Sequence, residues 1–170
     1  MSAIQETSPE QHEELHRIRH SLAHIMAQAV MEMRPGTKLG FGPPIEDGFY
    51  YDFILSEPLT EADFKEIEKR MKQIIKKKAV FEHEELRVED AYKRIDEMGE
   101  PYKREYAEEL VRKNGFKTLS FYRSGSFVDM CEGPHVEHSK KIHPGCFKLR
   151  SIAGAYWRGN SDNVMMTRIY

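Results

Sequence analysis

The sequence predicts an α+β fold in which helices pack on a mostly antiparallel sheet. A long amphipathic segment near the N-terminus has the period of a helix, and shorter segments farther along are apolar and β-prone. The predicted helices and strands are grouped instead of strictly alternating, which favours α+β. The 170 residues are 39% apolar and 32% charged, a balance typical of one globular domain. We expect a disordered arm over residues 1–7 and a single domain over residues 8–170.

The first helix has sequence signals at both ends. Ser8 is a suitable N-cap, Pro9 occupies the first helical position, and Gln11 completes a capping box. The helix is expected to end near residue 33, because a Pro-Gly pair follows at 35–36. Its apolar stripe, which we expect to face the core, consists of Leu15, Ile18, Leu22, Ile25, Met26, Ala29 and Met33.

Shorter elements follow this helix. Further helices are expected from Thr60 onward, over 89–98 and over 102–113, and the last two end at glycines. Segments rich in aromatic and β-branched residues are expected to be strands. These strands are 49–55, 80–87, 118–122, 127–131, 147–152 and 164–169.

Charge and cysteine content exclude several classes of protein. Lys and Arg number 26 and Asp and Glu 28, and a net charge of −2 argues against a protein that coats nucleic acid non-specifically. The chain has two cysteines, no signal peptide and no apolar run near 18 residues. We therefore expect a cytoplasmic location with reduced thiols and no membrane partner.

Two histidines lie on a second face of the first helix. His20 and His24 are four residues apart, so their side chains stack on one face, roughly opposite the apolar stripe. Their neighbours there are Ala23, Ala27 and Met31, where a solvated surface would carry Glu and Lys. This pattern indicates the floor of a site. It fits a partly covered helix with two polar histidines equally well, and the helix alone does not decide.

A second pair of metal-binding side chain types lies far along the chain. Cys131 and His135 are separated by three residues, and Gly133-Pro134 makes a turn between them. If the strand ending at Cys131 lies beside the first helix, three imidazoles and one thiol converge, and this set suits tetrahedral zinc. The spacing alone does not show whether this is a zinc site or a metal-free hydrolytic site. The zinc ligands would be His20, His24, Cys131 and His135.

The two pairs resemble the HxxxH and CxxxH motifs of the editing domain shared by threonyl- and alanyl-tRNA synthetases. Other segments resemble the bacterial-type threonyl branch, and the resemblance covers about residues 16 to 170. The segments that carry it are HSLAH at 20–24, GFYYDF at 48–53, GEPYK at 99–103, CEGPH at 131–135, AGAYWRGN at 153–160 and MTRIY at 166–170.

The resemblance implies proofreading by the domain over residues 8–170. A threonine-activating site has difficulty excluding serine, because a missing methyl group supplies only about 1–3 kcal/mol of discrimination. Members of the family hydrolyse the resulting serine ester in a second site that excludes threonine. We therefore expect an aminoacyl-tRNA deacylase whose partner is the acceptor end of tRNA(Thr) carrying serine.

The family also has segments that are not visible in this sequence. A small ubiquitin-like domain usually precedes the editing domain, and a class II aminoacylation core follows it. The block at 166–170 resembles the lead into that core. We expect that this chain cannot charge tRNA and that the missing core is a second partner. ATP, magnesium and a core zinc are then cofactors of the full-length enzyme only.

The resemblance also implies roles for individual residues. His20 is expected to contact the ribose hydroxyl or the water at the scissile ester. Lys103 is expected to hold this water and stabilise negative charge, and Asp129 to bind the amino group or hydroxyl of the substrate. Substitution of His20 or Lys103 is expected to affect the rate more than stability. His20 lies opposite the core stripe, and Lys103 follows Pro101-Tyr102 at a corner, where a flexible ammonium can reach into a cleft.

The remaining residues of the motifs are expected to complete the pocket. The pocket is expected to be shaped and polarised by His24, Cys131 and His135, which also share in catalysis. Substrate binding is expected from Cys131 and Asp129. Tyr51 is expected to form a wall or donate a hydrogen bond. The alanyl branch uses zinc with similar ligands, whereas the threonyl branch works with water and side chains. We therefore expect that editing requires no cofactor, although these ligands could hold zinc if it is supplied.

Three alternatives stay open at this point. One is a free-standing trans-editing deacylase of the alanyl type, against which the YWRG segment at 156–159 argues. Another is a non-catalytic RNA-binding module with a structural zinc. The third is a hydrolase that uses Cys131 as nucleophile and His135 as base.

Overall fold

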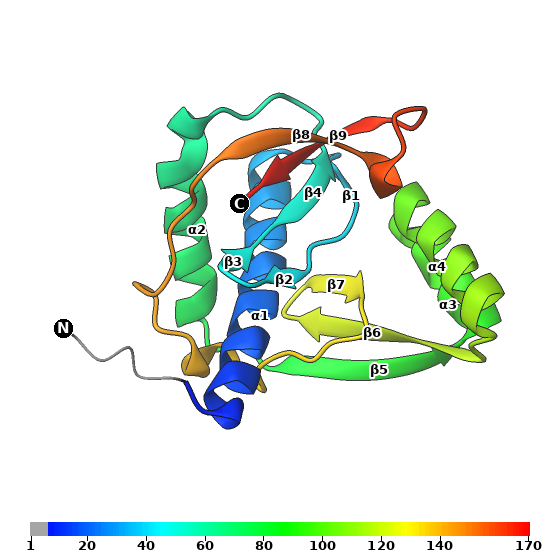
Figure 1. Cartoon of the computed structure of the whole chain (residues 1–170), viewed down its shortest axis with the longest axis horizontal. Helices are drawn as coiled ribbons and strands as arrows, with labels where there is room; N and C mark the ends of the chain where they lie inside the picture. The colour runs from blue at the N-terminus through cyan, green and yellow to red at the C-terminus, as the bar shows by residue number, and fades with distance from the viewer. Residues whose placement is uncertain (1–6) are drawn as a thin grey trace.

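The computed structural model describes residues 7–170 and confirms the α+β class. The long helix α1 (Pro9–Met33) runs through the middle of the molecule (Figure 1). It begins at the predicted capping box, in which Ser8 and Gln11 bond reciprocally. The expected disordered arm falls on residues outside the described range except for Thr7, whose hydroxyl lies 2.8 Å from Nε2 of His12.

The strands form three antiparallel groups. A four-stranded sheet has the order β1-β4-β9-β8, with the bounds Lys38–Leu39, Tyr51–Ile54, Met165–Ile169 and Ile152–Tyr156. A small pair joins β2 (Pro44–Ile45) to β3 (Gly48–Phe49). A three-stranded sheet has the order β5-β6-β7, with the bounds Phe81–Arg87, Thr118–Ser124 and Phe127–Met130.

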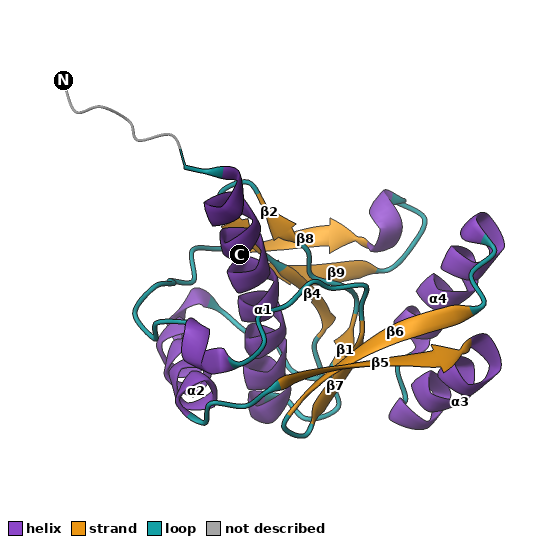
Figure 2. Cartoon of the chain, turned by 90° about the horizontal axis from the view of Figure 1, so that it is seen from below, coloured by secondary structure: helices purple, strands orange, loops and turns teal. Residues whose placement is uncertain are grey.

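The other helices lie at two ends of the molecule. Helix α2 packs along α1, whereas α3 and α4 lie together beyond the end of β5 and β6 (Figures 1 and 2). Their bounds are Phe64–Lys76, Val88–Met98 and Pro101–Asn114. Short 3-10 turns are η1 (Glu61–Asp63), η2 (Ser139–Lys141) and η3 (Trp157–Gly159). None of the described helices is long and apolar enough to cross a membrane.

Two predicted strands differ from the structure. The strand expected over 49–55 is interrupted at Tyr50, so that Phe49 ends β3 and Tyr51 begins β4. The segment 147–150 is irregular, and β8 begins only at Ile152, where the chain comes into register with Ile169 of β9. Leu149 is buried nonetheless, and its backbone N–H donates to the Glu68 carboxylate at 3.3 Å. An apolar alternation therefore occurs without a regular strand: the Leu149 N–H donates to a side chain, and regular pairing with β9 is preceded only by the bond from the Arg150 N–H to the Tyr170 carbonyl and that from the Tyr170 N–H to the Ser151 carbonyl. The strand β8 itself is not predicted in full, because its small residues lack the β-branched and aromatic side chains that indicate a strand.

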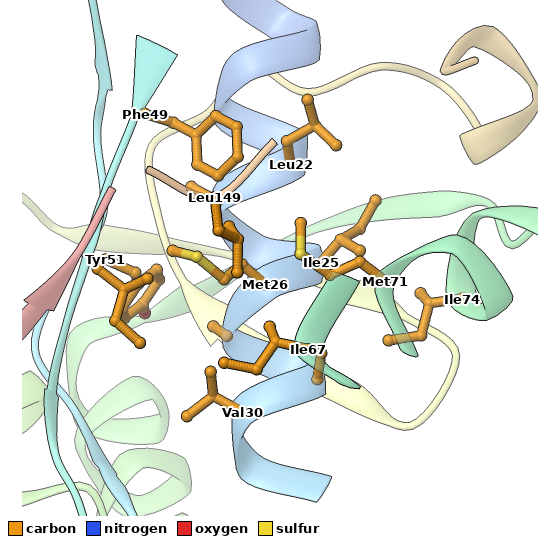
Figure 3. Packing of buried hydrophobic residues seen from close by; sticks show 14 of the residues in the cluster. Leu22, Ile25, Met26, Val30, Phe49, Tyr51, Ile67, Met71, Ile74 and Leu149 are labelled. Atoms are coloured by element: carbon orange, nitrogen blue, oxygen red, sulfur yellow. The ribbon is translucent and has the colours of Figure 1, made fainter. Parts of the chain in front are cut away.

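Helix α1 is buried on two faces. Ile25 and Met26 of the predicted stripe pack against Ile67 and Met71 of α2 (Figure 3). The opposite face is also buried. Of the residues in the predicted stripe, only the first, Leu15, is exposed against expectation. Leu15 is 36% exposed, because the first turns of α1 are largely exposed to solvent.

The four-stranded sheet is fixed by a cross-strand ion pair. Asp52 of β4 lies opposite Arg168 of β9, and the guanidinium donates to both carboxylate oxygens at 2.8 and 2.9 Å. The same guanidinium lies 3.9 Å from the centre of the Tyr50 ring. Because side chains alternate along a strand, the neighbouring Tyr51 projects from the other face of the sheet, toward the interior.

We expect Ile67→Ala to destabilise the protein by about 2–5 kcal/mol, because it leaves a cavity between α1 and α2. Ile67 is fully buried in the cluster that joins the two helices. Urea denaturation measures the change. The matched control is Lys69→Ala on the exposed side of the same helix, which should shift stability by less than about 0.5 kcal/mol. Equal losses in the two variants would contradict this packing.

Candidate active site

The structure brings the two histidine and cysteine pairs together. His20 and His24 project from the middle of α1, Cys131 directly follows β7, and His135 follows the Gly133-Pro134 turn. Their donor atoms all lie within 4.8 Å of one another. The Cys131 sulfur is 3.2 Å from Nε2 of His20 and 3.4 Å from Nε2 of His135.

Hydrogen bonds behind the rings fix their orientation. Nδ1 of His20 lies 3.1 Å from the Pro134 carbonyl, which can only accept, so this nitrogen carries the proton and Nε2 presents a lone pair. Nδ1 of His135 lies 3.0 Å from the Ser21 hydroxyl, which also accepts the backbone N–H of Val136 at 3.1 Å. The rings of His20 and His135 stack with centroids 4.1 Å apart.

Burial sets the protonation of this cluster. It lowers the pKa of His20 from 6.5 to about 4, although the Pro134 carbonyl and Asp129 act in the opposite direction. Burial, with neighbouring imidazoles, also lowers the pKa values of His24 and His135 well below the ordinary value. Burial, helped by Asp129, raises the pKa of the Cys131 thiol from 9.0 to about 12. Near neutral pH the site therefore presents three neutral rings and a protonated thiol.

Asp129 is the charged centre of the site. This carboxylate is 1% exposed and lies on β7. The Tyr51 hydroxyl donates to its Oδ2 at 2.5 Å, the Lys103 ammonium lies 3.0 Å from its Oδ1, and Nε2 of His24 lies 3.5 Å from Oδ2. Burial, followed by Asp129, raises the pKa of Tyr51 well above 10, which keeps its hydroxyl a donor.

Lys103 is held more firmly than the sequence suggests. Its side chain was expected to be flexible at a corner, yet Lys103 is 3% exposed. Its ammonium lies between the Asp129 carboxylate and the Tyr51 ring, whose centre is 5.4 Å away. Removing one partner of a buried ion pair costs about 3–5 kcal/mol. The structure therefore contradicts the expected flexible placement of Lys103, and we now expect that its substitution also lowers stability.

A cleft of about 220 Å³ opens beside these groups. Its polar wall is formed by His20, His24, Lys103, Asp129 and Cys131. The remaining residues predicted for the site, Tyr51 and His135, contact this wall from behind. The other wall is largely apolar and combines α4 and β6 with the loop that leads into β2, through Phe41, Pro43, Pro44, Tyr106, Leu110 and Leu119.

The loop before β2 lies tightly on the site. Gly40 N–H donates to the Asp52 carbonyl at 2.8 Å, and Asp52 N–H donates to the Phe41 carbonyl at 3.2 Å. A Cβ at Gly42 would collide with the Tyr51 ring and the Tyr50 carbonyl. The glycine is therefore required for the close approach of loop and sheet.

Sequence reasoning missed two groups of this site. Ser21 is fully buried inside the HSLAH motif, where a polar residue one step from His20 is a signal that we did not use. Phe41 and Tyr106 line the cleft with ring centroids 5.2 Å apart, although 65 residues separate them in sequence. Such a contact leaves no local signal.

The four donors fit a zinc ion. Zinc–ligand bonds of about 2.0–2.3 Å in a tetrahedron place neighbouring donors about 3.3–3.6 Å apart. The two sulfur–nitrogen distances of 3.2 and 3.4 Å are close to this range, and the four donor atoms, which lie within 4.8 Å of one another, would have to move closer together around an ion. Polar groups also hold one nitrogen of each ring, as they commonly do around metal-binding histidines: Pro134 for His20, Asp129 for His24 and Ser21 for His135.

This fold and site belong to a known class of domain. A family model described as the threonyl and alanyl tRNA synthetase second additional domain matches residues 119–170. The matched segment contains β6, β7, the CEGPH turn and the last two strands.

Relatives that match most of the chain narrow the class. The threonine–tRNA ligases of Borreliella afzelii and Gloeobacter violaceus are each 48% identical to it, over 92% and 93% of this chain. That of Treponema pallidum is 49% identical over 92%. The chain therefore corresponds in sequence to one part of threonyl-tRNA synthetases, as its motifs predict. It spans about a quarter of the length of these relatives, covering 25–26% of each.

We expect Ser21→Ala to destabilise the protein by about 1–3 kcal/mol, because it leaves the Val136 N–H buried without an acceptor. It should also change the tautomer equilibrium of His135, which ¹⁵N NMR of the ring nitrogens reports. The control is Ser161→Ala in an exposed turn, which should change neither quantity. A Ser21→Ala protein with unchanged stability and an unchanged His135 spectrum would contradict the assigned bonds.

Proposed function

We propose that this cleft hydrolyses the aminoacyl ester of tRNA(Thr) mischarged with serine. The observation that carries the proposal is that one cleft holds the neutral ring of His20 together with the buried Lys103–Asp129 ion pair. Ester hydrolysis needs a positioned water and a group that stabilises the charge of the tetrahedral intermediate. These two requirements match the two sets of side chains.

His20 is proposed to position the attacking water or the ribose hydroxyl. Its Nε2 presents a lone pair, while the Pro134 carbonyl holds Nδ1. A group with a pKa of about 4 is a weak base at neutral pH. We therefore assign to it the orientation of a hydroxyl through an accepted hydrogen bond and not full removal of the proton.

Lys103 and Asp129 are proposed to handle charge. The Lys103 ammonium is held in a site with little access to water, where its attraction to a developing oxyanion is much stronger than in solution. Asp129 keeps this ammonium in place and, at the cleft wall, offers an anionic partner for the amino group of the substrate. Tyr51 orients Asp129 from behind.

The other donors are proposed to shape the pocket. His24, Cys131 and His135 contact His20 or Asp129 and restrict the space beside them. If zinc is bound by these residues and His20, it supplies Lewis acidity to the ester or to water. We propose that editing proceeds without this metal, through side chains and water alone.

Two features favour this reaction over the alternatives. A cysteine nucleophile needs a thiolate, whereas burial raises the pKa of Cys131 to about 12 and lowers that of its neighbour His135. A structural zinc module needs no buried ion pair beside its ligands, yet Lys103 and Asp129 line the same cleft. The relatives named above are threonine–tRNA ligases, which favours the threonyl substrate over the alanyl one.

The partners follow from the same proposal. They are the acceptor end of tRNA(Thr) and the remainder of a threonine–tRNA ligase. Activation of threonine with ATP and magnesium is proposed for that remainder and not for this chain.

We expect the chain to release serine from Ser-tRNA(Thr) faster than threonine from Thr-tRNA(Thr), because the pocket has to exclude one methyl group. Single-turnover deacylation with each substrate measures this, at saturating protein so that weak binding does not lower the rate. Equal rates for the two esters, or no rate above that of free ester, would exclude the proposed function.

The same assay tests the metal and the alanyl alternative. A chelator should leave the rate on Ser-tRNA(Thr) unchanged, and metal analysis of the treated protein verifies that zinc is absent. Loss of activity that zinc restores would overturn the metal-free mechanism. Faster hydrolysis of Ser-tRNA(Ala) would favour the alanyl-type deacylase.

We expect Lys103→Ala to lower the single-turnover rate by about 10²- to 10³-fold, the range for loss of one stabilising donor. Since Asp129 loses its partner, the variant should also unfold at lower urea concentration, and rates are measured below its transition. The control is Lys113→Ala, an exposed lysine on the same helix, which should retain rate and stability. His20→Ala should lower the rate with a smaller loss of stability. A full rate in both variants would remove both residues from the mechanism.

A further inference from the structure

Glu100 is a buried acidic residue to which the proposed mechanism assigns no part. It is 4% exposed and lies in the turn between α3 and α4, after Gly99, which has a positive φ of 68°. Its backbone N–H donates to Ile95 of α3 at 3.3 Å, and its carbonyl accepts from Arg104 of α4 at 3.0 Å. The backbone of Glu100 is therefore fixed on both sides.

The side chain of Glu100 leaves this helical pair and reaches the four-stranded sheet. Its Oε2 accepts the backbone N–H of Leu39 in β1 at 2.8 Å. Leu39 belongs to the large apolar cluster around α1, whereas Ile95 and Ala107 of α3 and α4 belong to a separate apolar cluster. Glu100 thus joins the two packed regions through one charge-assisted hydrogen bond.

Lys103 depends on the same junction. It lies in the first turn of α4, three residues after Glu100, which is the N-cap of this helix. Its ammonium has to meet Asp129 of β7 and the Tyr51 ring of β4 at once. The reach of this side chain is fixed, so the distance between the start of α4 and the four-stranded sheet sets where the ammonium lies.

A carboxylate at this position is costly for stability. Burial raises the pKa of Glu100 from 4.5 to about 7, although the Leu39 N–H, Lys103 and Lys38 act in the opposite direction. A neutral or apolar side chain could fill the space at lower cost. An apolar side chain would, however, leave the buried Leu39 N–H without an acceptor, so the contact requires an oxygen acceptor, charged or neutral.

We infer that Glu100 is a positioning residue for Lys103, which holds the start of α4 against β1 so that the ammonium stays on Asp129 beside the cleft. This inference rests on the proposed function for its catalytic consequence. The contact itself, between Oε2 of Glu100 and the Leu39 N–H, is independent of that function.

The test compares two substitutions at this residue. E100Q keeps an oxygen that accepts the Leu39 N–H, and it should retain most of the single-turnover rate on Ser-tRNA(Thr). E100A removes the acceptor and should lower that rate by about 10- to 100-fold, the range for a small misplacement of a reacting group. The substrate concentration at half-saturation should change little. If E100A unfolds, Glu100→Met, which keeps the volume without an acceptor, replaces it.

A double substitution separates positioning from general stability. If Glu100 acts only through Lys103, E100A should cause no further loss of rate when added to Lys103→Ala. An equal loss in both backgrounds, or a full rate in E100A alone, would overturn the inference. The matched control is Glu97→Ala, an exposed acidic residue in the preceding turn, which should leave the rate unchanged.

A spectroscopic readout distinguishes failure of this inference from failure of the proposed function. The ¹⁵N signal of the Lys103 ammonium should be protected from exchange in the wild type and in E100Q, and lost or shifted in E100A. The inference fails if E100A leaves that signal unchanged. If the signal responds as expected but the wild type hydrolyses no ester, the positioning role stands and the hydrolytic function fails.

Discussion

The buried carboxylate of Asp129 is the group on which the arrangement of the cleft depends. A carboxylate that is 1% exposed is unstable without partners, and three elements each supply Asp129 with one partner side chain. Tyr51 comes from β4, Lys103 from α4 and His24 from α1. The four-stranded sheet, the helical pair and the central helix can therefore reach their final distances only together, and the cleft forms where they meet.

The features that the sequence predicted well are those with local causes. The capping box at Ser8 and the glycine ends of α3 and α4 depend on residues a few positions apart. The same holds for the shared face of His20 and His24. Family resemblance supplied the remaining step, since no spacing rule connects Lys103 or Asp129 to those histidines across the chain.

The features that the sequence did not predict have tertiary causes. The segment near Leu149 alternates like a strand, yet the Glu68 carboxylate accepts the Leu149 N–H, and regular pairing with β9 begins only at Ile152. Lys103 reads as a surface residue until Asp129 and the Tyr51 ring are placed beside it. The sequence pattern predicts that Leu15 is buried, but the first turns of α1 extend beyond the elements that would cover it. For Leu149 and Lys103 the partner lies tens of residues away in sequence, and for Leu15 no described segment fully covers the side chain.

The glycine beneath the apolar loop limits how this pocket can change. Because no side chain fits between Gly42 and the Tyr51 ring, the loop already lies at its closest approach to the sheet. Any larger residue at that point would push Phe41 and the two following prolines outward and disturb the tyrosine that orients Asp129. Redesign toward bulkier ligands has to begin on the α4 side, where shortening Tyr106 or Leu110 would enlarge the cavity without changing the charged wall.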